Sequence, residues 1–123
     1  MEINEISGIV IGVAIKVHKE LGPGLLESSY KEVLAFKLQQ AGLKVEKEKP
    51  VPLITDGVSI NCGYRMDILV EDALVIEIKA VDAFHPIHLA QMLTYLKTGG
   101  FHLGLLINFN VLLLKDGIKR VIL

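Results

Sequence analysis

The sequence has no excess of positive charge. Its 13 Lys and Arg residues are balanced by 14 Asp and Glu residues, which gives a net charge of −1 and a pI near 6.4. Proteins that bind nucleic acid tightly and without sequence preference are usually basic. The balance therefore counts against tight DNA binding by an isolated monomer, unless the positive charge is concentrated on one face.

Cysteine and long hydrophobic runs are also scarce. The single cysteine, Cys62, cannot form an internal disulfide, which suits a reducing cytoplasm. It falls in an expected strand, where a packing role is favoured. No apolar run reaches the ~18 residues needed to span a bilayer, and the first residues lack the basic start of a signal peptide. We therefore expect a cytoplasmic protein without a membrane partner.

Length and composition fit one globular domain. The chain has 123 residues, of which 51% are hydrophobic and 22% charged, enough for one core. No internal repeat, low-complexity tract or linker interrupts it. We expect residues 1–123 to form a single domain. Because a core of this size has little surface to spare for a large ligand, a homodimer is favoured.

The most informative stretch lies at residues 63–80. Two apolar runs rich in β-branched residues flank a short polar break, which predicts a β-hairpin. Glu77 and Lys79 are two residues apart on the second strand and share a face, and Asp67 lies on the first strand at about the same height. Two carboxylates beside an ammonium can hold a hard divalent cation. The alternative is that Glu77 and Lys79 form a solvated strand face.

Neighbouring residues favour the cation site over a solvated face. The second strand is apolar on both sides of Glu77, as in a central strand, and charges there cost free energy unless they are paired or bound. A three-residue loop at residues 71–73 would place Asp67 opposite Glu77, whereas a two-residue loop would send Glu77 to the opposite face. A shared site therefore predicts an odd loop, or a bulge that restores the phase.

These residues resemble the signature of the PD-(D/E)XK nuclease superfamily. Asp67, a short gap and then Glu77-Ile78-Lys79 are similar to the pattern that names it, although Met66 stands where the pattern has proline. Residues 24–30 resemble the GxxExxY pattern of a small branch of the superfamily. Residues 91–95 resemble the QxxxY motif of its RecB-like members. The resemblance extends from about residue 18 to the end of the chain.

The resemblance implies a fold and an activity. The fold is an α/β restriction-endonuclease-like core with a mixed central β-sheet flanked by helices. The activity is metal-dependent hydrolysis of phosphodiester bonds in nucleic acid, with DNA as the favoured substrate. The expected metal ion is Mg²⁺, for which Mn²⁺ could substitute. Asp67 and Glu77 would hold the ion, with the backbone carbonyl of Ile78 as a third ligand and Glu27 acting through water or at a second ion.

The same resemblance suggests roles for three more residues. Lys79 would orient the attacking water or stabilise charge in the transition state. Gln91 would position Lys79 or the substrate phosphate, and Tyr95 would support the site. Non-catalytic roles remain open at this point: Glu27 could merely offset a helix dipole, Gln91 could be solvated, and Tyr95 could be a core residue.

Two other classes of function remain open. One is a non-catalytic nucleic-acid- or protein-binding module that retains the nuclease fold, and the other is a metal-dependent hydrolase of small phosphoesters. His85 and His88 lack the spacing of metal ligands within a helix, so structural roles are favoured for both. Tyr30 could pack in the core or reach the metal site.

Hydrophobic periodicity predicts the order of the secondary structure. The expected elements are helices at residues 3–21 and 25–41, strands at 43–54, 58–70 and 74–81, a helix at 87–98, a strand at 102–108, and a last hairpin at 111–115 and 118–123. Gly24 is the expected cap of the second helix, with Phe36 and Ala41 on its buried side. Asp116-Gly117 predicts a type I′ turn, and the third helix permits a parallel crossover.

Overall fold

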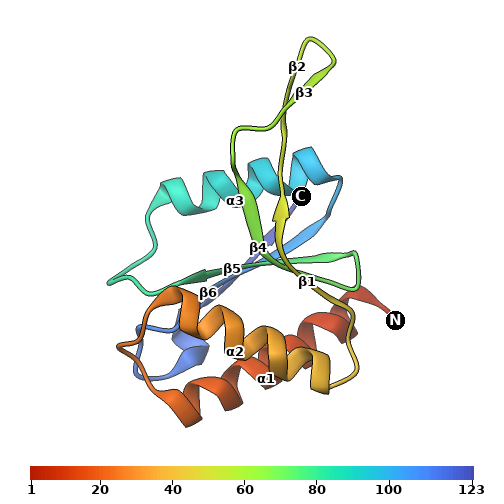
Figure 1. The fold of residues 1–123 in the computed structure, drawn as a ribbon. Helices are drawn as coiled ribbons and strands as arrows, with labels where there is room; N and C mark the ends of the chain where they lie inside the picture. The colour runs from red at the N-terminus through yellow and green to blue at the C-terminus, as the bar shows by residue number, and fades with distance from the viewer.

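The protein folds around a five-stranded mixed sheet. The computed structural model describes residues 1–123, and Figure 1 shows α1 (Ile3–Leu21) and α2 (Glu27–Gln40) on one face of the sheet and α3 (Pro86–Gly99) on the other. The strands of the sheet, in spatial order, are β1 (Val45–Pro50), β4 (Arg65–Val70), β5 (Leu74–Lys79), β6 (Leu103–Asn108) and β7 (Ile118–Ile122). None of the helices is long and apolar enough to cross a lipid bilayer.

The central strands define the topology. β5 pairs antiparallel with β4 and parallel with β6, and α3 provides the connection between the two parallel strands. Every residue of β6 is buried, as its apolar sequence predicts for a strand covered on both faces. The mixed α/β architecture and the parallel crossover expected from the sequence are therefore confirmed.

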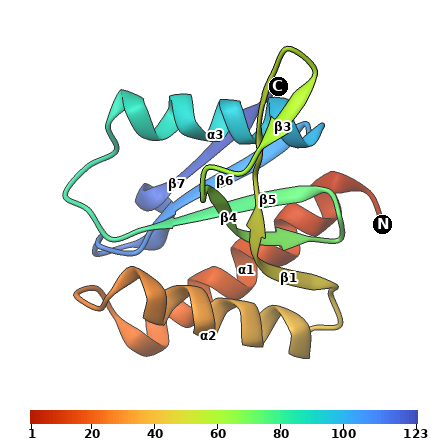
Figure 2. The same ribbon diagram turned by 45° about the horizontal axis from the view of Figure 1, so that its top comes forward.

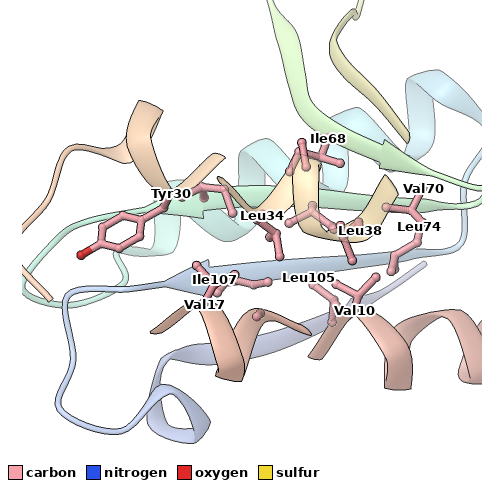
Figure 3. Packing of buried hydrophobic residues seen from close by; sticks show 14 of the residues in the cluster. Val10, Val17, Tyr30, Leu34, Leu38, Ile68, Val70, Leu74, Leu105 and Ile107 are labelled. Carbon is pink, nitrogen blue, oxygen red and sulfur yellow. The ribbon is translucent and has the colours of Figure 1, made fainter. Parts of the chain in front are cut away.

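Two hydrophobic cores hold the helices to the sheet. The larger core lies between the sheet and the pair α1 and α2, where Val10, Leu34 and Leu38 meet Leu74 and Leu105 in Figure 3. The smaller core lies under α3 and includes Met92, Tyr95 and Leu96. β5 alternates between the two cores, so the odd-numbered residues Glu77 and Lys79 belong to its α3 face.

A close approach fixes α3 against β6. A Cβ atom at Gly104 of β6 would collide with the side chain of Met92 in α3. The absence of a side chain at this position lets Met92 rest directly on the strand. The contact holds α3, which also carries Gln91 and Tyr95, close to the sheet.

A small hairpin projects from the sheet. β2 (Leu53–Thr55) and β3 (Val58–Ile60) extend beyond the sheet on the α3 side (Figures 1 and 2). The turn expected at residues 55–57 is confirmed, with positive φ angles of 50° at Asp56 and 74° at Gly57. The long strand expected at residues 58–70 is interrupted at residues 61–64. Cys62 lies in this break and is exposed, so the packing role expected for it is wrong.

The predicted C-terminal hairpin is also wrong. Leu114–Gly117 forms the 3-10 turn η1, and β7 pairs with β6 rather than with a strand at residues 111–115. Leu114 is buried in the larger core, which draws the segment inward. Gly117 lies against the backbone carbonyl of Asn108, where a Cβ would collide, and it has no positive φ. Glycine at this position serves close packing instead of a type I′ turn.

Two details of the second helix differ from expectation. Phe36 and Ala41 are exposed rather than buried. The buried side consists of Tyr30, Leu34, Ala35 and Leu38. Phe36 lies about half a turn from Leu34 and Leu38, so it points to solvent. The N-cap is Leu26 rather than Gly24, which makes Glu27 the first helical residue instead of the third.

Candidate active site

The candidate site lies where β4 and β5 separate. Their ladder begins beside the loop at residues 71–73 and ends at Ile68↔Ile76. The three-residue loop that a shared face requires is therefore confirmed, and Asp67 and Glu77 form the next opposed pair. Beyond them β4 curves away from β5 toward the β2–β3 hairpin (Figure 1). We call the gap between the strands at Asp67 and Glu77 the fork.

The two carboxylates bridge the fork. The backbone N–H of Asp67 donates to Glu77 Oε1 at 3.0 Å, and the backbone N–H of Ile78 donates to Asp67 Oδ2 at 2.7 Å. Carboxylate oxygens thus take the place of backbone carbonyls in the ladder, which fixes both side chains between the strands. These two backbone hydrogen bonds use one oxygen of each carboxylate, Glu77 Oε1 and Asp67 Oδ2.

Burial makes the carboxylate pair costly to ionise. Glu77 is only 5% exposed, and its burial, followed by the negative charge of Asp67, raises its pKa to about 8. Burial also raises the pKa of Asp67, although the hydrogen bond from Ile78 acts in the opposite direction. The pair therefore keeps a proton at neutral pH when no cation is bound. An all-oxygen donor set with this penalty fits a hard divalent cation.

Lys79 places an ammonium beside the carboxylates. Its charge lowers the pKa of both Asp67 and Glu77, but its ammonium forms no ion pair within 4.0 Å. The chain just after Lys79 is held by Asn108, whose amide accepts from the backbone N–H of Val81 at 3.1 Å and donates to its carbonyl at 2.9 Å. The carbonyl of Lys79 itself accepts a hydrogen bond from the backbone N–H of Phe109 at 3.0 Å.

Glu27 reaches the fork from α2. Its Oε1 accepts a hydrogen bond from the backbone N–H of Ala80 at 3.2 Å. Glu27, Ser28, Lys31 and Asp67 together line a polar cavity of about 180 Å³. No group of three or more His, Cys, Asp or Glu side chains has the spacing of a metal site. Glu27 therefore borders the fork without completing a compact three-carboxylate cluster.

Lys31 is a residue of the site that the sequence interpretation missed. Its ammonium pairs with Glu48 at 2.6 Å, and its side chain is only 14% exposed. The positive charge of Lys31 lowers the pKa of Asp67, which shows that it acts on the fork. Lys31 lies four residues after Glu27 and therefore on the same face of α2. This four-residue spacing is the feature of the sequence that could have assigned Lys31 to the same site as Glu27.

Glu48 occupies a strained position in β1. It lies directly across from Asp67, and β1 pairs regularly with β4 on both sides of it. Glu48 itself has a φ of 54°, a left-handed conformation that costs a non-glycine residue about 1–2 kcal/mol. The distorted backbone accompanies the contact of Glu48 with Lys31. Unusual backbone of this kind occurs often at functional sites.

Two substitutions of Glu48 separate strain from charge. Glu48→Ala removes the ion pair with Lys31 and keeps the strained backbone, whereas Glu48→Gly removes both. We expect the glycine variant to exceed the alanine variant in free energy of unfolding by about 1 kcal/mol. Urea unfolding of both variants measures this difference. A less stable glycine variant would contradict the left-handed backbone at this position.

Tyr95 approaches the fork from α3, whereas Gln91 lines a neighbouring pocket together with Tyr95. Tyr95 is 4% exposed, and burial, followed by the charges of Glu77 and Asp67, raises its pKa to about 12. Its hydroxyl therefore stays protonated at any physiological pH. Gln91 lies one turn earlier and is half-buried. The side-chain hydrogen bonds of α3 come from other residues, so the amide of Gln91 is uncommitted.

Two further candidates have structural roles. The ring of His88 accepts a hydrogen bond from the backbone N–H of His85 at 3.1 Å at the start of α3, and burial lowers the pKa of His88. Tyr30 is fully buried, stacks on Phe109 with ring centroids 4.4 Å apart, and donates its hydroxyl proton to the carbonyl of Gly22. Tyr30 thereby holds the loop that leads into α2.

Comparison with known proteins identifies the family. A family model described as the PD-(D/E)XK nuclease superfamily matches residues 4–121. The chain belongs to this superfamily. Neither curated proteins nor solved structures give a match.

Membership in the PD-(D/E)XK nuclease superfamily connects the fold and the chemistry. The five-stranded mixed sheet flanked by helices is consistent with the restriction-endonuclease-like fold expected from the sequence. The superfamily consists of nucleases that generally hydrolyse phosphodiester bonds, so nucleic acid is the implied class of substrate. Asp67, Glu77 and Lys79, which the sequence analysis expects to form the signature, lie together at the fork.

Proposed function

We propose that this protein is a divalent-metal-dependent nuclease that hydrolyses phosphodiester bonds in DNA. The observation that supports it most directly is the pair of buried carboxylates at the fork. Asp67 and Glu77 each use only one oxygen to accept from the backbone across the fork, and Lys79 lies next to them without an ion pair of its own. Such a pair is unfavourable unless it binds a cation.

The proposed metal ligands are oxygen atoms. Asp67 and Glu77 would hold the ion, with the backbone carbonyl of Ile78 as a third ligand and Glu27 contributing through water or at a second ion. This donor set suits Mg²⁺, with Mn²⁺ as a substitute. A bound cation would make a coordinated water more acidic and would offset negative charge on the phosphoryl oxygens.

The remaining residues would act on the substrate. Hydrolysis forms a P–O bond to the water oxygen and breaks the P–O bond to the leaving oxygen, which takes up a proton. Lys79 would donate to a phosphoryl oxygen that gains negative charge in the transition state. Gln91 would position Lys79 or the phosphate. Tyr95, whose pKa is raised to about 12, would remain a neutral hydrogen-bond donor beside the carboxylates.

A cleavage assay tests this proposal. Purified protein is incubated with single-stranded, duplex and branched DNA, and with RNA of the same sequence, in Mg²⁺, in Mn²⁺ and in chelator. We expect metal-dependent cleavage of DNA. Binding without cleavage under every metal condition would instead support a non-catalytic module that retains the fold.

The effect of Asp67→Asn on thermal stability tests the proposed metal site. The amide oxygen can still accept from Ile78, while the substitution removes a buried negative charge next to Glu77. We therefore expect the melting temperature in chelator to rise or stay unchanged. Metal binding at a hundredfold excess over the dissociation constant should stabilise the wild type by about 2.7 kcal/mol, and the variant should lose most of this gain.

Thermal melts of both proteins, with chelator and with millimolar Mn²⁺, provide the data. A large loss of stability for Asp67→Asn in chelator would mean that Asp67 is a structural partner in an ion pair. A metal-induced shift equal to that of the wild type would place the ion elsewhere.

Three finer assignments belong to the same proposal. The segment at residues 24–30, with Glu27 bordering the fork and Tyr30 holding the loop before α2, supports membership in the GxxExxY branch. We also propose that residues 1–123 act as one domain and that the protein is a homodimer in solution. A molar mass from light scattering that equals one chain would contradict the dimer.

A further inference from the structure

An uncharged pocket lies beside the fork, between α3 and the base of the β2–β3 hairpin. It has a volume of about 320 Å³, and its walls include Leu53, Tyr64, Ile87, Gln91 and Tyr95. None of its lining residues is charged. The pocket borders the proposed active site at Tyr95, which lines the pocket and whose pKa is raised in part by the charges of Glu77 and Asp67.

The walls of the pocket suit a flat, neutral, polar-edged ligand. The rings of Tyr64 and Tyr95 meet edge to face, with centroids 6.5 Å apart and an angle of 61° between their planes. Tyr64 is 45% exposed and Ile87 is also largely exposed, so apolar surface remains available for contact. The uncommitted amide of Gln91 supplies both donors and an acceptor at the same place.

The uncharged pocket differs in charge from the neighbouring part of the site, which contains Lys79 and Lys31 and would bind the phosphate. A phosphate would be drawn to the ammonium groups of Lys79 and Lys31, whereas nothing in the pocket can neutralise an anion. An unpaired nucleobase is planar and neutral, stacks on aromatic side chains, and presents donors and acceptors on its edge. Its chemistry matches aromatic and apolar walls around one amide.

We propose that this pocket is a base subsite, which holds one unpaired nucleobase of the substrate next to the phosphate that is cut. The proposal rests on the nuclease function argued above, since it assumes that nucleic acid enters the fork. A base can enter the pocket only when it is unstacked, at a single strand, an end or a branch. The net charge of −1 agrees with binding that depends on stacking more than on phosphate contacts.

An abasic-site scan tests the subsite directly. The ligand is a labelled single-stranded DNA oligonucleotide in which one base at a time is replaced by an abasic site, and its affinity is measured by fluorescence anisotropy in chelator, so that no cleavage occurs. For the wild type we expect the affinity to fall about fivefold to a hundredfold when the base that occupies the pocket is missing, and little elsewhere. A flat profile for the wild type would overturn the subsite.

Variants of Tyr64 test whether the loss of affinity in the abasic-site scan arises from this pocket. Tyr64→Ala should flatten the scan, while Tyr64→Phe, which keeps the ring, should preserve it. Leu112→Ala, at an exposed residue that does not line the pocket, is the matched surface control and should leave the scan unchanged. A Tyr64→Ala profile like that of the wild type would also overturn the subsite, and circular dichroism melts verify that each variant is folded.

Cleavage data keep this proposal distinct from the nuclease function. A protein that cleaves DNA but gives a flat scan is a nuclease without the base subsite. A protein that gives a position-dependent scan lost in Tyr64→Ala, yet cleaves nothing in Mg²⁺ or Mn²⁺, has the base subsite without the proposed hydrolysis.

Discussion

Lys79→Ala is expected to lower the rate of metal-dependent DNA cleavage by about 10²–10³-fold, the usual effect of removing a group that stabilises charge in the transition state. Lys79 forms no ion pair in the protein, and its backbone is held by the pairing of β5 with β6 and by the backbone N–H of Phe109, which donates to the carbonyl of Lys79. The substitution should therefore leave the fold intact. Metal affinity should change little, because the proposed ligands are all retained.

Single-turnover cleavage assays and Mn²⁺ titrations of the purified variant measure the two quantities separately. Lys97→Ala, at an exposed lysine in the last turn of α3, controls for the loss of one positive charge. Undiminished cleavage by Lys79→Ala would refute the proposed role of its ammonium.

Glu77→Gln is expected to change how the stability of the metal-free protein depends on pH. Burial and Asp67 raise the pKa of Glu77 from its usual 4.5 to about 8, so between these values the folded protein keeps a proton that the unfolded chain has released. The free energy of unfolding should therefore fall as the pH rises through this window, by at most about 1.4 kcal/mol per pH unit. Glutamine at this position cannot titrate, and it keeps an oxygen for the hydrogen bond from Asp67.

Urea unfolding of wild type and Glu77→Gln in chelator, at several pH values from 5 to 9, provides the comparison. The stability advantage of the variant should grow with pH and then level off above the folded pKa of about 8. Glu20→Gln, an exposed position on α1, serves as the control for a neutralised surface carboxylate. A constant difference across the range would show that Glu77 ionises normally in the folded protein.

The paired carboxylates could be predicted from the sequence because a strand has a period of two. Once the loop at residues 71–73 has an odd number of residues, Asp67 and Glu77 must oppose one another on one face. The separation of the strands at that point could not be predicted in the same way. It accompanies the bend of β4 toward the β2–β3 hairpin, which is a tertiary feature that no local pattern in the sequence encodes.

Residues brought to the site by packing were harder to identify. Lys31 approaches through the docking of α2, and Tyr64 through the break between β3 and β4, so neither belongs to a local motif around the fork. Packing also overrode a strong local signal at Asp116-Gly117. The burial of Leu114 and the close contact of Gly117 with Asn108 replaced the expected hairpin turn.

The most direct test of the carboxylate pair as a cation site is calorimetric titration of Mn²⁺ at pH 7 in two buffers with different ionisation enthalpies. Because Glu77 has a pKa of about 8 without metal, binding should release about one proton per ion, and the observed heat should differ between the buffers accordingly. Asp67→Asn should remove most of this binding. Heats that do not depend on the buffer, or an Asp67→Asn variant that binds Mn²⁺ as tightly as the wild type, would contradict a metal site at the fork.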